Sequence, residues 1–196
     1  MNLFFYKDNF LSADDFNKLN QLSIRRYPMI EKEDKYARQN PFHPIRSRDQ
    51  QLPAGHTSVP PELSLRYGNI TVKAIDQIYQ FLINDAQVIK PELATVWFAY
   101  MNPGQYLDFH CDGPVRDVPV ERCVTVCLYI HEHWEEDWGG EIESEEGTKF
   151  LPMSNRLIVW SRDVIHRVAD IKTTELPFKR AIMASTWTTE GLKPDQ

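Results

Sequence analysis

The chain has 196 residues, of which 42% are hydrophobic and 26% are charged, a composition typical of a soluble globular protein with one domain. Its formal net charge of −6 argues against a general nucleic-acid binder, which would be basic. No apolar run approaches the length of a membrane span, and the short apolar N-terminal patch is broken by Lys7 and Asp8, unlike a signal peptide. Three cysteines form no even-numbered disulfide framework and are typical of a reducing compartment. We therefore expect a single cytoplasmic domain over 1–196 that binds neither membranes nor nucleic acid.

The start of the chain predicts an edge strand and then a helix. Residues 3–6 are apolar and predict a short strand. Ser12 precedes two acidic residues and an apolar repeat at helical spacing, which is typical of an N-cap and a first helical turn. We expect Pro28 to end this helix, because proline lacks the N–H that a helix interior uses.

A second amphipathic helix is predicted from about residue 70 to 86, after a long irregular segment. Prolines and polar residues interrupt any sustained period over 31–66. A loop of that length in a compact domain is usually functional or disordered, so this segment is a candidate lid. We expect residues 1–90 to act as a helical and loop-rich support for the rest of the domain.

Residues 91–190 predict β-structure. Eight short stretches have strand character and are separated by turn signals such as Pro-Gly, Gly-Gly and Ser-Asn pairs. They cover 93–101, 106–110, 122–130, 139–143, 148–151, 156–160, 165–168 and 179–188. Strands at this spacing are typical of a double-sheet jelly roll. We therefore expect a mainly β (α+β) fold with the two N-terminal helices packed on the outer face of one sheet.

The predicted strand at 122–130 has two uncharged faces. One face is aliphatic and the other is small and polar; the two sets are Val124, Val126, Leu128 and Ile130, and Cys123, Thr125, Cys127 and Tyr129. Because neither face suits bulk water, both are expected to be covered. We expect the aliphatic face to meet helices or a sheet and the polar face to line an internal pocket. A core strand with satisfied hydroxyls is the alternative.

His110 and Asp112 are two residues apart, so in an extended strand their side chains point to the same face. His166 begins another short predicted strand and is the candidate third ligand. Two histidines and one carboxylate from separate strands are typical of the facial triad of non-haem Fe(II) oxygenases, which leaves positions open for a chelating cosubstrate and O2. Cys111 lies between the first two ligands and is expected to point away from them and pack.

A chelating keto acid would also need a partner for its far carboxylate. Arg180 begins the last predicted strand and offers a permanently charged, bidentate partner. Tyr129 and Tyr100 could donate hydroxyl hydrogen bonds to the same anion, and Thr125 shares the polar face of Tyr129. We predict that these four residues form a cosubstrate site.

The stretch from Tyr100 to Trp187 resembles the Fe(II)- and 2-oxoglutarate-dependent oxygenases of the prolyl 4-hydroxylase type. The motifs that carry the resemblance are, in order, Gly104-x-Tyr106-x3-His110-x-Asp112, Arg122 to Tyr129, Trp134, Gly139-Gly140-Glu141, His166-x-Val168, Arg180 and Trp187. The segment from Arg122 to Tyr129 looks particularly like the prolyl hydroxylases that act on hypoxia-inducible factor.

The resemblance implies a double-stranded β-helix that binds Fe(II) through His110, Asp112 and His166. It also implies that 2-oxoglutarate chelates the iron and reaches Arg180, helped by Tyr129 and Tyr100. Reaction with O2 would yield succinate, CO2 and a hydroxylated C–H bond, with ascorbate as a candidate reductant. The implied substrate is a prolyl peptide, an amino acid or another small molecule.

Two departures from the family pattern bear on the site. Arg180 precedes Trp187 by one residue more than is usual, which implies a bulge or a different anchor, and Lys179 is the alternative. His131 stands where many relatives have Asn and begins a His-Glu-His sequence, which we interpret as a rim feature rather than a metal site.

Two other functions stay open beside a hydroxylase. A cupin-like binding module would hold a metal without catalysis and would produce no succinate. A metal-dependent isomerase or dioxygenase without 2-oxoglutarate would turn over its substrate in the absence of any keto acid. The oligomeric state also stays open at this point.

Overall fold

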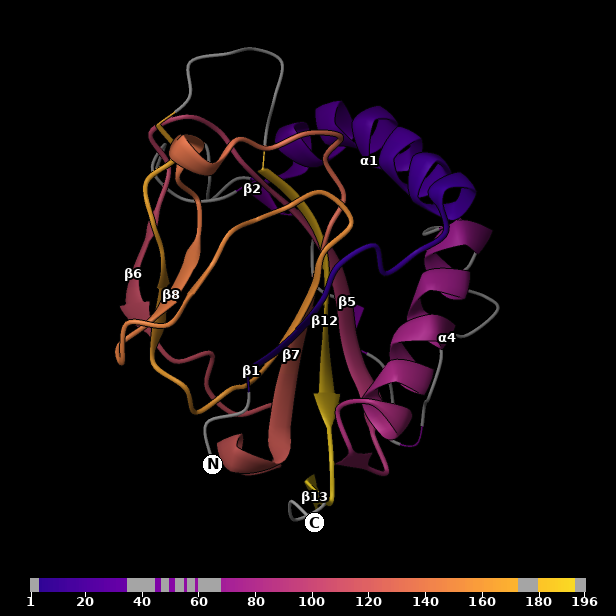
Figure 1. The fold of residues 1–196 in the computed structure, drawn as a ribbon. Coiled ribbons are helices and arrows are strands. Elements are labelled where there is room, and N and C mark those ends of the chain that lie inside the picture. Colours follow the sequence, from indigo (N-terminus) through magenta and orange to yellow (C-terminus); the bar gives the residue numbers. More distant parts are fainter. Residues whose placement is uncertain are drawn as a thin grey trace.

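We describe the fold from a computed structural model, which covers residues 4–34, 45–46, 50–51, 55, 59, 68–172 and 180–192. Two main antiparallel sheets form the body of the molecule, and two helices lie along one side of it (Figure 1). The helices are α1 (Ala13–Glu33) and α4 (Asn69–Asn84), with 3-10 turns η1 (Val120–Arg122) and η2 (Glu136–Trp138). The strands are β1 (Phe4–Lys7), β2 (Ile45–Arg46), β3 (Gln50–Gln51), β4 (Val88–Ile89), β5 (Glu92–Met101), β6 (Leu107–His110), β7 (Cys123–Tyr129), β8 (Ile142–Ser144), β9 (Lys149–Phe150), β10 (Leu157–Ser161), β11 (His166–Val168), β12 (Arg180–Thr188) and β13 (Gly191–Leu192).

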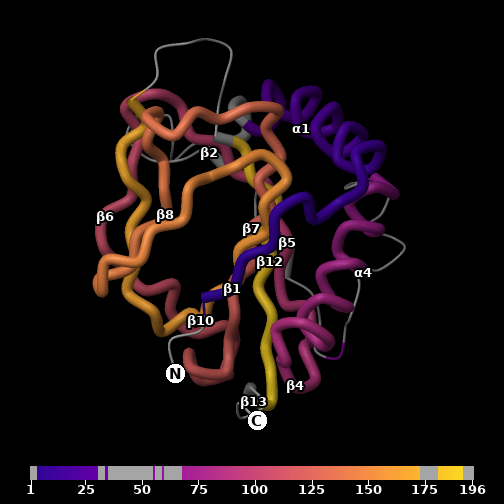
Figure 2. The backbone as a smooth tube through the Cα atoms, viewed as in Figure 1, coloured from indigo at the N-terminus to yellow at the C-terminus, as the bar shows by residue number. Residues whose placement is uncertain are grey.

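The strand order confirms the predicted jelly roll. A seven-stranded sheet runs β1-β10-β7-β12-β5-β2, with β3 also paired to β5, and a four-stranded sheet runs β6-β11-β8-β9. All eight predicted strands of the core are present, with bounds close to those expected. The predicted N-terminal edge strand is also present, because β1 pairs with β10 at one edge of the larger sheet, about 150 residues away along the chain (Figure 2).

The two helices cover the outer face of the larger sheet, as predicted (Figure 1). Their buried residues, such as Leu19, Ile75 and Ile78, share one apolar cluster with outward-facing residues of the sheet. Among the described residues, no helix is long and apolar enough to cross a membrane.

Helix α1 begins as predicted but continues further. Ser12 is the N-cap, and its hydroxyl accepts a hydrogen bond from the backbone N–H of Asp15 at 3.3 Å. The expected end at Pro28 is wrong, because the helix runs on to Glu33 with Pro28 inside it. A proline inside a helix costs about 3 kcal/mol, because it removes one backbone hydrogen bond and its ring clashes with the carbonyl four residues earlier. Burial of Ile30, which is 5% exposed, in the outer apolar cluster offsets part of that cost.

Strand β7 divides its two faces as the sequence predicts. Every residue of the strand is buried. Val124, Val126 and Leu128 join the outer apolar cluster beneath the helices, whereas Thr125 and Cys127 line a cavity between the sheets. The predicted internal pocket on this face is therefore present in part, because Cys123 and Tyr129 lie in apolar clusters and are not among the residues that line the cavity.

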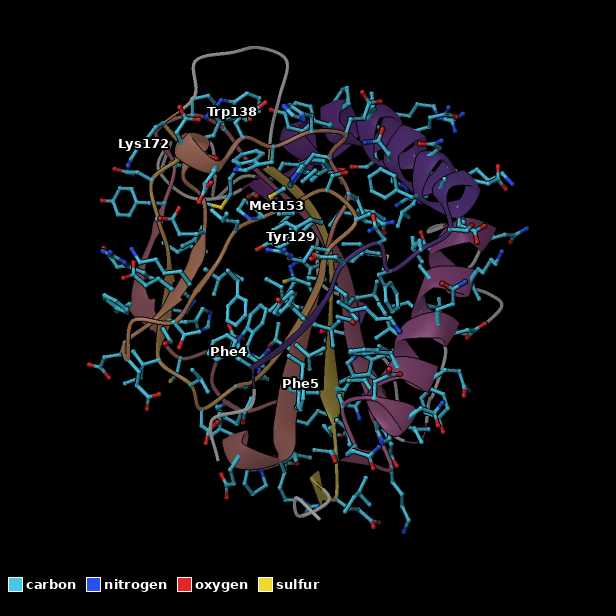
Figure 3. All side chains as sticks on the ribbon, viewed as in Figure 1. Phe4, Phe5, Tyr129, Trp138, Met153 and Lys172 are labelled. Atoms are coloured by element: carbon cyan, nitrogen blue, oxygen red, sulfur yellow. The ribbon has the colours of Figure 1, made fainter. Side chains whose placement is uncertain are left out.

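A second apolar cluster lies between the two sheets, fills part of the space there and joins them. It contains Tyr129 and Ile182 from the larger sheet and Ile142 and Val168 from the smaller one. Figure 3 shows Tyr129 and Phe4 among the side chains in this interior. Phe4 stacks on Phe150 with ring centroids 5.1 Å apart, so β1 also contributes to closing the space between the sheets.

The spacing of Arg180 and Trp187 implied a bulge near the last strand. A bulge is present, but it lies in β5, the strand that pairs with β12. Between β12 and β5, Thr186 pairs with Thr95 and Trp187 pairs with Leu93, so Ala94 of β5 is the additional residue. Against β7 the register of β12 is unbroken. Strand β12 therefore alternates regularly from its first residue.

Most of the candidate lid over 31–66 lies outside the described residues. The described parts include β2 and β3, both of which pair with β5.

Candidate active site

His110 and His166 are direct partners across one antiparallel strand pair. His110 ends β6 and His166 begins β11, and the register places them opposite each other. Side chains directly opposite on one face of such a pair are close neighbours, and here the ring centroids are 4.6 Å apart. Strand β11 is held on its other side by β8, so the pairing has support from the rest of the small sheet.

Both imidazole rings are oriented by backbone carbonyls. Nδ1 of His110 lies 2.6 Å from the carbonyl oxygen of Asp108, and Nδ1 of His166 lies 3.0 Å from that of Val164. Because a carbonyl only accepts hydrogen bonds, each Nδ1 must carry the proton and donate it. This tautomer leaves the lone pair of each Nε2 available to a metal ion.

Burial lowers the pKa of His166, even though the nearby carboxylate of Asp112 acts in the opposite direction. The ring is only 3% exposed, and an apolar environment disfavours its charged form. His166 is therefore kept in the neutral state that a metal ligand needs.

Asp112 reaches the histidines from beyond the end of β6. The strand ends at His110, so a continuous strand does not place the carboxylate. Instead, the backbone N–H of Asp112 donates to the carbonyl of Arg162 at 3.2 Å, and Nη2 of Arg162 donates to the carbonyl of Asp112 at 2.5 Å. Oδ1 of Asp112 lies 3.9 Å from Nε2 of His110, and ligand atoms of Asp112 and both histidines lie within 4.8 Å of one another.

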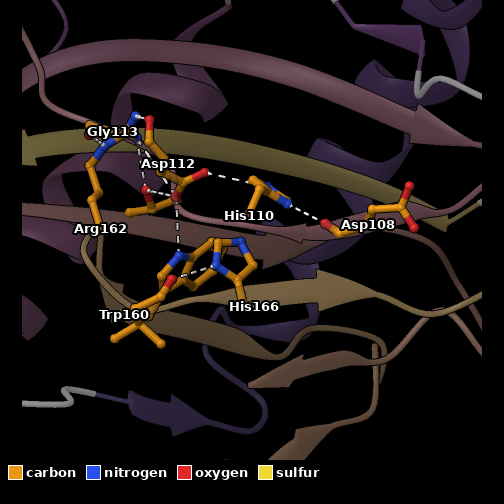
Figure 4. Close-up of polar contacts among 9 residues, drawn as sticks. Asp108, His110, Asp112, Gly113, Trp160, Arg162 and His166 are labelled. Atoms are coloured by element: carbon orange, nitrogen blue, oxygen red, sulfur yellow. Dashed lines mark hydrogen bonds and ion pairs between the residues drawn. The ribbon is translucent and has the colours of Figure 1, made fainter. Parts of the chain in front are cut away.

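The second carboxylate oxygen of Asp112 is occupied by protein donors (Figure 4). Oδ2 accepts hydrogen bonds from Oγ1 of Thr125 at 2.6 Å and from Nε1 of Trp160 at 3.1 Å. Arg162 donates to Oγ1 of Thr125 at 2.9 Å and to the carbonyl of Gly113 at 2.8 Å. Sequence reasoning missed the contribution of Trp160 and Arg162, because their contacts with Asp112 and Thr125 join residues 37 to 50 positions apart in the chain.

The three converging groups suit a metal ion with open coordination positions. Two imidazole nitrogens and one carboxylate oxygen form a 2-His-1-carboxylate donor set, which is typical of non-haem Fe(II). Cys111 is not among the converging groups. It is exposed, so the expectation that it packs is wrong, because the chain has already left the strand there.

A cavity of about 630 Å³ between the sheets contains all three groups. The wall of the cavity beside the three candidate metal ligands is formed by Thr125, Cys127, Trp160 and Arg162. The remaining lining comes mainly from β5, β6, β12 and the loop after Asp112: Ala94, Thr95, Trp97, Ala99, Met101, Leu107, Asp108, Phe109, Cys111, Pro114, Val115, Arg116, Ile142, Val168, Ile182 and Thr186. The mixed lining can hold an organic cosubstrate and part of a substrate together.

The structure does not bring all four predicted cosubstrate residues together. Thr125 lines the cavity, but its hydroxyl is directed to Asp112. Tyr129 is fully buried on the inner face of β7, two residues beyond Cys127. Tyr100 belongs to the outer cluster, and its hydroxyl donates to the carbonyl of Ser23 in α1 at 3.0 Å. Burial raises the pKa of Tyr100 to about 12.

Arg180 is the first residue of β12, and its backbone pairs with Met101 of β5. Two and four residues further along, Ile182 and Ala184 belong to the inner cluster. The side chain of Arg180 and the whole of Lys179 lie outside the described part of the structure, so the choice between these two anchors stays a prediction.

His131 is a buried structural residue, so its interpretation as a rim feature is wrong. It is 4% exposed. Its Nε2 lies 2.6 Å from the carbonyl of Pro152, and its Nδ1 accepts from the backbone N–H of Ala181 at 3.2 Å. The imidazole therefore bridges the loop before β10 to the start of β12, whereas His133 at the other end of the motif has a half-exposed side chain.

Comparison with known proteins gives a family match in the part of the chain that carries this site. Residues 96–188 match the model of the 2OG-Fe(II) oxygenase superfamily. That range contains all three converging groups and both candidate anchors. Among curated proteins, no match is found.

Several solved structures share the fold at low sequence identity. A prolyl-4-hydroxylase from Pseudomonas putida is 21% identical, with a TM-score of 0.62 over 97% of this chain and 95% of that chain. The viral collagen prolyl hydroxylase of Paramecium Bursaria Chlorella virus-1, in its 2OG complex, is also 21% identical, with a TM-score of 0.61 over 95% of each chain. A Trichoplax adhaerens prolyl hydroxylase in complex with a hypoxia inducible factor peptide is 20% identical, with a TM-score of 0.61 over 95% of this chain and 83% of that chain. These likenesses show that the chain shares a double-stranded β-helix fold with these three proteins.

Proposed function

We propose that this chain is a member of the 2OG-Fe(II) oxygenase superfamily, whose model residues 96–188 match, and that it is a dioxygenase that uses Fe(II), 2-oxoglutarate and O2 to hydroxylate a C–H bond. The observation that carries the proposal is the convergence of His110, Asp112 and His166 within 4.8 Å inside the cavity. When bound, the iron and its cosubstrates supply the oxidising chemistry, and succinate and CO2 are the co-products.

The roles of the three ligands follow from their surroundings. The histidines would offer Nε2, because their Nδ1 atoms donate to backbone carbonyls. Asp112 would offer its carboxylate and supply the negative charge that a divalent cation attracts. The buried, neutral state of His166 supports its role as a ligand, since no proton has to be displaced from Nε2.

Arg180 is our proposed anchor for the far carboxylate of 2-oxoglutarate. Residues two apart on a strand share a face, and β12 alternates regularly, so position 180 falls on the face of Ile182 and Ala184 in the inner cluster. An arginine there would pair with a carboxylate in bidentate fashion. The inner-face position of Tyr129 supports a second contact with the same anion.

The proposed substrate is a prolyl residue in a peptide. This rests on the fold shared with prolyl hydroxylases, one of which was solved with a bound peptide. A free amino acid and another small molecule are the alternatives. We further propose a cytoplasmic location, which the three free cysteines support, and a single domain in which residues 1–90 support the β core at 91–190.

The experiment that tests the function is anaerobic addition of Fe(II) and then 2-oxoglutarate, followed by admission of O2. We expect a weak visible charge-transfer band and slow formation of succinate without any substrate. His110→Ala should abolish both, whereas His133→Ala, at an exposed histidine outside the site, should change neither.

Three outcomes would contradict the proposal. Folded protein that binds Fe(II) but gives neither band nor succinate would favour a cupin-like binding module. Substrate turnover in the absence of 2-oxoglutarate would favour another metal enzyme. Loss of metal binding in His133→Ala but not in His110→Ala would overturn the ligand assignment. A screen of prolyl peptides against free amino acids for faster succinate formation then identifies the substrate class.

A further inference from the structure

We propose that Thr125, Trp160 and Arg162 act together as positioning residues. They keep Oδ2 of Asp112 engaged in hydrogen bonds within the protein, so that only Oδ1 can bind the metal. This inference rests on the proposed function, because it concerns the ligand that would hold the iron. It assigns Thr125 to the carboxylate ligand rather than to the cosubstrate.

The direction of each hydrogen bond follows from what the groups can donate. A guanidinium has no acceptor, so Oγ1 of Thr125 must accept from Arg162 at 2.9 Å. The single proton of the hydroxyl is then free to point to Oδ2 of Asp112 at 2.6 Å. The indole of Trp160 can only donate, and it donates to the same oxygen at 3.1 Å.

The two oxygens of Asp112 therefore differ in their surroundings. The hydrogen bonds that described side chains donate to this carboxylate both reach Oδ2. Oδ1 faces Nε2 of His110 at 3.9 Å, on the side where the three ligand atoms converge. Carboxylates bind metals through one oxygen or two, and two donors on Oδ2 make binding through both oxygens unfavourable.

Arg162 keeps this arrangement in place. Its guanidinium also donates to the carbonyls of Asp112 at 2.5 Å and Gly113 at 2.8 Å, and its backbone N–H donates to the carbonyl of Cys123 at 3.0 Å. The turn after β10 is thereby tied to the corner that carries the carboxylate and to the start of β7 (Figure 4).

Water cannot readily replace these donors, because they are buried. Thr125 and Trp160 are 2% and 3% exposed, and the side chain of Arg162 is 11% exposed. Charge-assisted hydrogen bonds in such an environment are stronger than at the surface. Loss of one donor would therefore leave Oδ2 able to turn toward the metal.

The consequence concerns the number of open coordination positions. A facial triad leaves three positions in an octahedral site, of which a chelating keto acid takes two and O2 needs the third. A carboxylate bound through both oxygens would occupy one of them. The three positioning residues thus keep open the coordination positions that the cosubstrates need.

The test compares Thr125→Val with Thr125→Ser in Co(II)-substituted protein. Valine keeps the shape of threonine and removes the hydroxyl, whereas serine keeps the hydroxyl and is the matched control. We expect Thr125→Val to change the visible Co(II) spectrum toward a higher coordination number and to weaken 2-oxoglutarate binding about tenfold, the lower end of the effect of outer ligand partners. Thr125→Ser should match the unchanged protein in both measurements.

Trp160→Phe provides a second variant at the other donor, since it removes the indole N–H from the same oxygen and keeps a smaller aromatic ring beside His166. We expect a smaller change of the Co(II) spectrum in the same direction. Urea unfolding of the apo proteins identifies any variant that fails to fold.

The inference is overturned if the folded Thr125→Val and Trp160→Phe variants have the same Co(II) spectrum and the same 2-oxoglutarate affinity as the wild-type protein. That result would leave the proposed function intact, because the unchanged protein would still bind both. If the unchanged protein binds no Co(II), the inference and the proposed function both fail.

Discussion

Tyr100 and Tyr129 lie on opposite faces of the seven-stranded sheet. Tyr100 belongs to the outer cluster beneath the helices, and its hydroxyl bonds with Ser23 of α1. Tyr129 belongs to the inner cluster between the two sheets. Only the second face borders the cavity that contains the candidate metal group, so the face of the sheet decides which tyrosine can serve a cosubstrate there.

Tyr100→Phe should therefore affect stability and not cosubstrate binding. The substitution removes two hydrogen bonds with Ser23, each worth about 1 kcal/mol. We expect the free energy of unfolding in urea to fall by about 1–2 kcal/mol, with no change in the affinity for 2-oxoglutarate. A tenfold weaker affinity in the folded variant would return Tyr100 to the cosubstrate site.

Tyr100 should also make the protein sensitive to alkaline pH. Its pKa is about 12 in the folded protein because of burial, whereas an unfolded tyrosine titrates near 10. Between these values the folded state binds more protons than the unfolded state, so stability falls as pH rises. This contribution is fully present below pH ~10 and is lost as pH rises toward ~12. Urea unfolding at a series of pH values should show the loss, and Tyr100→Phe should reduce it.

Arg180→Ala and Lys179→Ala should separate the two candidate anchors. Removal of the residue that pairs with the far carboxylate of 2-oxoglutarate should cost at least 2 kcal/mol, or more than tenfold in affinity. We expect that loss for Arg180→Ala and a change below threefold for Lys179→Ala, measured by titration of the charge-transfer band. The reverse pattern would make Lys179 the anchor.

His166→Ala and His131→Ala compare two buried histidines with different surroundings. We expect His166→Ala to abolish measurable Fe(II) binding, since it removes one of the three proposed ligands. His131→Ala should keep the metal affinity, but it leaves the Ala181 N–H and the Pro152 carbonyl without their imidazole partner. Its free energy of unfolding should fall by about 2–4 kcal/mol. Loss of metal binding in His131→Ala alone would contradict the site described above.

Gly139→Ala should destabilise the fold strongly, because the backbone at Gly139 passes very close to the backbone carbonyl of Asp170. Gly139 has φ +72°, and a Cβ there would lie 2.0 Å from the carbonyl oxygen of Asp170. We expect a loss of about 3 kcal/mol in the free energy of unfolding. Gly147→Ala is the matched control, since its φ is +88° with no atom within 4 Å of the added Cβ, and it should cost only about 1 kcal/mol. Equal losses in the two variants would show that conformation alone matters at Gly139.

The β core could be predicted closely because its signals are local. Alternating side chains and turn residues identified all eight core strands, and the two different faces of β7 predicted both a helix-covered side and a cavity. The length of α1 could not be predicted in this way. Whether a helix continues past Pro28 depends on the burial of Ile30 against the sheet, which is a contact between distant parts of the chain.

The candidate site, like the fold, has some features that the local sequence predicts and others that depend on contacts between distant residues. The candidate ligands His110, Asp112 and His166 could be predicted from the sequence, because they belong to motifs with a recognisable order and spacing. Three features required the folded structure: which oxygen of Asp112 faces the histidines, the hold of Arg162 and Trp160 on this carboxylate, and the orientation of Tyr100 toward the helices. These features depend on hydrogen bonds and faces formed between residues far apart in the chain, and local spacing carries no information about them.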